Sequence, residues 1–148
     1  MRPERKKKAG DQALGRSRGG FSTKLNVAVD ALGNPVELKL TPGQTHDMVA
    51  AEAMVEEHDP EYLIADKGFD SEAFIDHLEK QGIKVVIPPR SNRKTPRDYD
   101  PHLYKERNLV ERFINRIKHY RRVATRYEKL ARNFLGFVQV AAIMVLLR

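Results

Sequence analysis

The stretch from Tyr104 to Lys118 constrains the fold more than any other part of this chain. Neither Gly nor Pro interrupts it, and large apolar residues recur in and just before it at helical spacing: Leu103, Leu109, Val110, Phe113, Ile114 and Ile117. This periodicity predicts an amphipathic helix with one buried face.

Four side chains of different chemistry border that apolar face. At about 100° per residue, they fall within a sector about 60° wide: Tyr104, Arg107, Glu111 and Lys118. A carboxylate flanked by cations suits metal-dependent phosphoryl transfer on nucleic acid, because the carboxylate holds a divalent cation, the cations hold phosphates and the ring stacks on a base. The alternative is a solvated ladder of ion pairs, which contributes about 0.2–0.5 kcal/mol per pair.

Composition narrows the class of protein. A length of 148 residues fits one domain or a large part of one. The net charge of +7 favours a polyanionic partner over a small neutral substrate. The absence of cysteine excludes a disulfide framework and a thiolate metal site. We therefore expect a cytoplasmic protein that contacts DNA.

Two segments bear on targeting and membranes. The N-terminal residues 1–8 carry cations but no apolar run behind them, so they do not resemble a signal peptide. The most apolar stretch, residues 134–147, is too short to span a bilayer and predicts a buried core helix. No membrane contact is expected.

The first 20 residues differ in composition from the rest. They are basic and Gly-rich, with almost no large apolar residue, which predicts a flexible segment followed by a single domain over residues 21–148. Two roles for residues 1–20 remain open, a disordered tail and an arm that contacts DNA.

The remaining chain alternates between strand and helix patterns. Short apolar or alternating runs predict strands at residues 21–29, 35–40, 62–65 and 84–87. The predicted order is strand, strand, helix, strand, helix, strand, loop (90–101), helix, helix, which defines an α/β fold. The first helix is expected to be capped by Thr45 or Asp47, and the second by Asp70 or Ser71.

Asp66 directly follows the predicted strand at residues 62–65, and Gly68 lies two positions later. A buried strand that delivers an acid at its carboxyl end commonly builds a site in α/β sheets. Asp66 is therefore a second candidate site residue, beside Glu111.

The spacing Tyr104-x2-Arg107-x3-Glu111-x6-Lys118 resembles the Tyr-Arg-Glu-Lys signature of bacterial DDE transposases, in the group that includes the "insertion sequence 5" family. The resemblance covers about residues 10–148. It implies an RNase H-like mixed sheet flanked by helices, which opens with three antiparallel strands. This chain shows only two strands before its first helix, so we expect the fold to be incomplete at the N-terminus, with its first strand absent.

The resemblance also implies a site. DDE transposases hold two divalent metal ions with three carboxylates. Asp66 matches the second Asp and Glu111 matches the Glu, so both are expected to be catalytic metal ligands for Mg²⁺ or Mn²⁺. The resemblance implies DNA contacts for the remaining signature residues, Tyr104, Arg107 and Lys118. The basic cluster that follows the signature helix adds two further DNA-binding candidates, Arg121 and Arg122.

The counterpart of the first catalytic Asp would precede Met1. Asp30 is better interpreted as a turn residue, because its turn would lie at the opposite end of the sheet from Asp66. Asp11 has no strand to carry it. His46, Asp47 and Asp70 are interpreted as residues at helix starts. The chain thus resembles the larger, C-terminal part of a catalytic domain: a second reading frame expressed by frameshifting, a truncated relic, or a product with a mis-annotated start.

The expected function is that of a transposase that recognises the ends of an insertion sequence and, when complete, cuts and joins DNA. Its expected partners are DNA, the product of an upstream reading frame and further copies of itself on DNA. One alternative is a non-catalytic, DNA-binding truncated transposase that acts as a regulator, or a pseudogene product. Another is an unrelated metal nuclease, which would hydrolyse DNA by itself.

Overall fold

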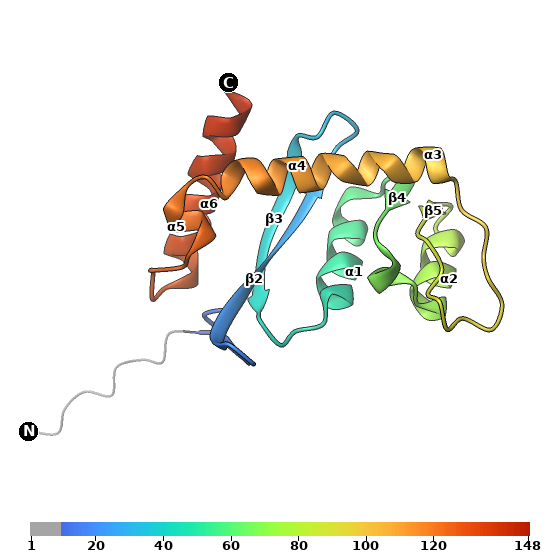
Figure 1. Ribbon diagram of the computed structural model, residues 1–148, viewed down its shortest axis with the longest axis horizontal. Coiled ribbons are helices and arrows are strands. Elements are labelled where there is room, and N and C mark those ends of the chain that lie inside the picture. Colours follow the sequence, from blue (N-terminus) through green and yellow to red (C-terminus); the bar gives the residue numbers. More distant parts are fainter. Residues whose placement is uncertain (1–9) are drawn as a thin grey trace, which may run out of the picture.

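The computed structural model describes residues 10–148 (Figure 1). Its longest strands form an antiparallel hairpin, β2 (Gly20–Val29) and β3 (Pro35–Pro42), in which Leu25 lies opposite Leu40. Alternating side chains of this hairpin pack against the helices on one of its faces, as expected for a half-buried sheet. The two predicted strands are confirmed.

The turn between these strands is built by Asp30. Its Oδ1 accepts hydrogen bonds from the backbone N–H groups of Leu32 and Asn34, both at 2.9 Å, and its Oδ2 accepts one from Asn34 Nδ2. These bonds hold the pKa of the Asp30 carboxyl below its ordinary value, with the Asn34 backbone N–H as the largest cause. The interpretation of Asp30 as a turn residue is confirmed.

Part of the N-terminal segment differs from the expectation of flexibility. Residues Gly15–Ser17 form strand β1, which pairs with residues 20–22 of β2, and Ala13 is buried. Three antiparallel strands therefore precede the first helix, so the expectation of only two is wrong. Contacts with the distant C-terminal part hold this segment, since Arg126 Nη1 donates to the Gln12 carbonyl at 2.8 Å. Predictions for residues 1–9 lie outside the described residues.

A second, parallel sheet consists of β4 (Tyr62–Ile64) and β5 (Lys84–Val86). Helix α1 (Asp47–His58) precedes β4, and α2 (Glu72–Lys80) connects β4 to β5. A single 3₁₀ turn, η1 (Lys67–Phe69), lies between β4 and α2. Helix α1 contacts both β2 and β3 and lies between the hairpin and the parallel sheet (Figure 1).

The predicted cap residue is wrong for α1 and right in position for α2, and neither helix has a side-chain capping bond. Helix α1 follows His46, which makes no capping bond. Instead, Lys24 Nζ on β2 donates both to the Thr45 carbonyl and to the Asp47 carboxylate, each at 2.9 Å. The Asp47 carboxylate therefore pairs with a strand residue and does not cap its own helix. Helix α2 does follow Ser71, but the Ser71 hydroxyl makes no capping bond. The Asp70 carboxylate is buried and accepts hydrogen bonds from Arg90 and Arg93 instead.

The signature region forms a long helical rod. It consists of α3 (Pro101–Tyr104), a 3₁₀ turn η2 (Lys105–Arg107) and α4 (Asn108–Ile117), which Figure 1 shows crossing the molecule from the α2 side to the α6 side. A short helix, α5 (Arg121–Ala124), and the long α6 (Ala131–Leu146) follow. The predicted helix at residues 104–118 is therefore confirmed, although its first turn is tighter than an α-helix.

Two hydrophobic cores form within the described residues. In the first, α4, α5 and α6 pack against the β2–β3 hairpin around Phe113, Ile117 and Val138. In the second, α1 and α2 pack with the β4–β5 sheet around Phe74 and Leu78. Each sheet thus has its own core, and the molecule is built as two packed halves joined by α1 and the rod.

Helix α6 departs from its predicted burial. Phe134 and Val138 are buried, but Val140 and Ile143 on another face are more than half exposed. The long apolar run thus covers one face of the first core and leaves a second apolar face at the surface. No helix of the described residues is both long and apolar enough to cross a membrane.

The α/β class is confirmed, with antiparallel and parallel pairing both present. These pairings occur in two separate sheets, whereas the expected fold has one mixed sheet. Within the described residues, the stretch 23–29 of β2 pairs with β3 alone, and β4 pairs with β5 alone. The stretch 23–29 of β2, and the strands β3, β4 and β5, therefore each have one edge that pairs with no described strand.

Candidate functional site

Asp66 lies where the sequence predicted it, just beyond the end of β4. It is exposed and caps the 3₁₀ turn η1, because its Oδ1 accepts a hydrogen bond from the Gly68 N–H at 2.8 Å. A Cβ at Gly68 would lie 2.7 Å from that same oxygen, so a larger residue there would have to displace the carboxylate from this position. Oδ2 accepts no hydrogen bond from any described residue, which leaves one carboxylate oxygen free for a ligand.

Three of the four signature residues contact one another in sequence order. The Arg107 guanidinium lies 5.7 Å from the centre of the Tyr104 ring, and its Nη2 lies 2.7 Å from Glu111 Oε1. The Glu111 side chain is 49% exposed. An ion pair this exposed is worth about 0–1 kcal/mol, so a stronger ligand for the carboxylate can displace it. The ion-pair ladder and the metal-ligand interpretation are thus compatible in this geometry.

The cations that follow α4 differ in their partners. Lys118 ends the helix, is exposed, and its side chain pairs with no described residue. Arg121 Nε donates to the Tyr127 hydroxyl at 2.9 Å. Arg122 forms an ion pair at 2.7 Å with Glu128, whose side chain is only 7% exposed. Lys118 and Arg121 are therefore more available to a phosphate than Arg122, which pairs with the Glu128 carboxylate.

The two candidate metal ligands belong to different halves of the molecule. Asp66 follows β4 and is positioned by the core of α1, α2, β4 and β5. Glu111 is carried by α4, whose Phe113 and Ile117 belong to the core formed with the β2–β3 hairpin. The relative position of these halves therefore decides how far apart the two carboxylates lie.

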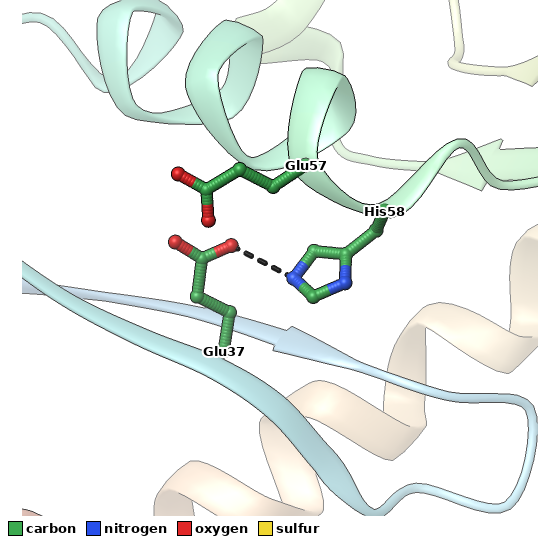
Figure 2. A group of neighbouring side chains, drawn as sticks. All are labelled: Glu37, Glu57 and His58. Carbon is green, nitrogen blue, oxygen red and sulfur yellow. Dashed lines mark hydrogen bonds and ion pairs between the residues drawn. The ribbon is translucent and has the colours of Figure 1, made fainter.

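The described residues contain one group of three close metal-ligating side chains, and it includes neither candidate. Glu37 on β3 and Glu57 and His58 at the end of α1 have ligand atoms within 4.8 Å of one another (Figure 2). His58 Nε2 donates to Glu37 Oε2 at 2.9 Å. No local sequence pattern reveals this cluster, because its members come from separate elements. Its hydrogen bond joins α1 to β3.

Asp70 has a role that its position before a predicted helix did not reveal. It is the one charged residue that is buried among the described residues. Its carboxylate accepts hydrogen bonds from the backbone N–H of Arg90, at 2.7 Å, and from Arg93 Nη1. The number of arginines in the segment 90–97 was the only available signal that a buried acid would be needed.

The other candidate acids have local roles. Asp11 Oδ1 accepts a hydrogen bond from the Ala13 N–H at 2.9 Å, which closes a turn before β1. Asp30 belongs to the β2–β3 turn and Asp47 to the ion pair with Lys24. None of these three carboxylates is directed toward Asp66 by a contact in the described chain.

Comparison with known proteins adds a family assignment. Residues 2–146 match the sequence model of a family described as "Transposase DDE domain". A protein of Brucella ovis, named as a candidate transposase for insertion sequence element IS6501, is 37% identical over 132 residues, which span 86% of this chain and all of that protein. A protein of Burkholderia cepacia, named as a candidate transposase for insertion sequence element IS402, is 27% identical over 150 residues, which span 93% of this chain and 68% of that protein. No solved structure matches.

Proposed function

The chain belongs to the Transposase DDE domain family, and we propose that it supplies two of the three catalytic carboxylates of a DNA strand-transfer site, Asp66 and Glu111. The observation that carries this proposal is the contact chain Tyr104–Arg107–Glu111 on the rod, together with an exposed acid at the carboxyl end of β4. The proposed reaction is cutting and joining of insertion-sequence DNA by phosphoryl transfer.

The donor chemistry of both residues fits a divalent cation. DDE domains generally use divalent metal ions, and carboxylate oxygens are the ligands that Mg²⁺ and Mn²⁺ prefer. Two such ions, when bound, activate a hydroxyl nucleophile and stabilise the leaving oxygen of a phosphodiester. Asp66 would offer its free Oδ2. Glu111 would exchange its exposed pairing with Arg107, whose guanidinium could then hold a phosphate oxygen.

We further propose that a strand bearing the third carboxylate pairs with the open edges of β2 and β4. The open edges of β2 and β4 in the described chain support this idea, because each offers unpaired backbone groups. In this proposal an upstream polypeptide supplies the strand, and the 148-residue chain is inactive alone.

DNA contacts complete the proposal. Tyr104 would stack on or wedge against a displaced base, and Lys118 and Arg121 would hold backbone phosphates near the cleavage point. Self-association on DNA is part of the proposal, and the exposed apolar face of α6 offers a surface for it.

Binding of a labelled duplex at low and moderate ionic strength tests this function. Affinity should fall steeply with salt, because phosphate contacts release counterions. Lys118→Ala should lower the slope of log affinity against log salt by about one unit. Lys80→Ala, which removes an exposed cation from the end of α2, is the matched control and should change the slope less. Salt-independent binding would contradict the proposal.

A second candidate function is favoured by the same incomplete site. A non-catalytic product with this structure could still bind insertion-sequence DNA and compete with an intact transposase. Supplying the missing strand distinguishes the two functions, because only the catalytic proposal predicts that strand cleavage then appears. An unrelated nuclease would instead cleave DNA with this chain alone.

A further inference from the structure

The segment of residues 90–97, here called the arginine loop, adjoins the turn that presents Asp66. We propose that the arginine loop is a second phosphate-binding element of the DNA site, and that Asp70 is the positioning residue that holds it there. This inference rests on the proposed function, since it takes DNA as the partner, but it concerns residues outside the signature helix.

The anchor of the loop is a buried carboxylate. Asp70 is 6% exposed, and it accepts from the Arg90 backbone N–H and from Arg93 Nη1, with Arg97 Nη2 at 4.0 Å. An ionised carboxylate is buried only when charged or hydrogen-bonding partners compensate its lost hydration. All of these partners come from the arginine loop, so the burial of Asp70 and the position of the loop depend on each other.

A second set of bonds attaches the loop to the turn at Asp66. The Arg90 guanidinium donates to the Gly68 carbonyl from Nη2, at 2.6 Å, and to the Lys67 carbonyl from Nε, at 3.2 Å. Lys67 and Gly68 directly follow Asp66 and form η1. The arginine loop is therefore bonded to the turn that directly follows the candidate metal ligand, where a phosphate backbone passing over that turn would meet it.

The local charge leaves a surplus that a polyanion can use. Five cations gather on η1 and the arginine loop around one buried acid: Lys67, Arg90, Arg93, Lys94 and Arg97. Arg90 directs its guanidinium hydrogen bonds to neutral carbonyls and keeps its full charge, and Lys67, Arg90 and Lys94 are exposed. The exposed acids that adjoin these cations in the sequence are Asp66 itself and Asp98. Several cations spread over one loop suit consecutive phosphates of a nucleic acid better than a single small anion.

The variant Asp70→Asn tests positioning against simple charge. The substitution makes the region more positive, so electrostatics alone predicts tighter and more salt-dependent binding of a random-sequence duplex. If Asp70 positions the loop, binding weakens instead, and the salt slope falls by about 0.9 for each phosphate that the loop no longer neutralises. Unchanged or tighter binding by a folded Asp70→Asn protein would overturn the inference.

Substitutions at the loop surface keep the test decisive if Asp70→Asn does not fold. Arg90→Gln and Lys94→Gln should each lower the salt slope by about 0.9, whereas Lys80→Gln should not. Arg93→Lys keeps the charge but loses the planar guanidinium, so it should weaken binding more than Arg132→Lys on α6.

The outcomes separate this inference from the proposed function. If Lys118→Ala lowers the slope and the arginine-loop variants do not, the inference is wrong and the function stands. If the unmodified chain shows no salt-dependent DNA binding, both are wrong.

Discussion

The arginines that follow α4 show that a residue's role depends on the atoms around it more than on its type. Arg126 resembles a DNA-binding cation in the sequence, but its guanidinium donates to the carbonyls of Gln12, Glu128 and Lys129 and to the Thr23 hydroxyl. It also lies 5.6 Å from the centre of the Phe134 ring. Arg126 thus joins the N-terminal segment, β2 and the start of α6.

Arg126→Lys should therefore destabilise the fold while leaving the net charge unchanged. An ammonium cannot reproduce the fork that reaches four acceptors, and we expect a loss of about 1–3 kcal/mol in the free energy of unfolding. Denaturant titration measures this loss. Arg132→Lys, at an exposed position on α6, is the control and should change stability by less than about 0.5 kcal/mol. Equal stabilities of the two variants would contradict this role for Arg126.

No local pattern could have revealed this contact. Gln12 and Thr23 lie 114 and 103 positions from Arg126 in the sequence. Asp30, by contrast, bonds within its own turn, and its role was predicted from residues 30–34 alone. At the residue scale, sequence patterns predicted local roles and missed those that depend on distant partners.

Asp30 should make stability depend on pH in the acid range. Its folded-state pKa is lowered by the turn hydrogen bonds, so its contribution is fully present above the unfolded value near 3.8 and is lost as the pH falls through the folded pKa. The difference in stability between the unmodified chain and Asp30→Asn should therefore shrink as the pH falls from 3.8 through the folded-state pKa. Thermal unfolding of both proteins between neutral and acid pH measures it. A difference that stays constant below pH 3.8 would contradict the turn role.

At the scale of elements, the helical rod shows what periodicity can and cannot predict. The apolar spacing correctly predicted a helix at residues 104–118 and the burial of Phe113 and Ile117. It did not predict that the rod begins at Pro101, because that start depends on a cap rather than on an apolar stripe. It also missed the 3₁₀ turn η2, whose tighter winding rotates Tyr104 relative to Glu111.

Asp100→Ala should loosen the start of the rod. The Asp100 carboxylate accepts from the backbone N–H groups of His102 and Leu103, at 2.8 and 3.2 Å, and its loss should cost about 0.5–2 kcal/mol of stability. Asp100→Ser should retain most of the stability, because serine is also a good cap. Asp98→Ala, two positions earlier in the loop, is the control. Denaturant unfolding followed by circular dichroism distinguishes them, and equal losses for Asp98 and Asp100 would contradict the capping role.

For the whole molecule, the decisive feature is the division into two sheets with separate cores. Sequence patterns predicted each strand except the short β1, and they predicted the local pairing of β2 with β3 across the Asp30 turn. They did not predict the pairing of β4 with β5, because a whole helix separates these two strands in the chain. The open edges of β2 and β4 belong to different halves, and so do Asp66 and Glu111. A strand that paired with both sheets would therefore also fix the distance between the Asp66 and Glu111 carboxylates.

Under the proposed function, the 148-residue chain alone should neither cleave nor join DNA. Fusing it to an upstream segment that encodes an apolar strand with an Asp should close the open edges, raise solubility and allow Mg²⁺- or Mn²⁺-dependent strand cleavage. In that fusion, Glu111→Gln should abolish cleavage and spare DNA binding, since it removes a metal ligand without adding bulk. Nicking of supercoiled plasmid measures cleavage. Metal-dependent nicking by the unfused chain, lost on Asp30→Asn, would show instead that Asp30 is the missing catalytic acid.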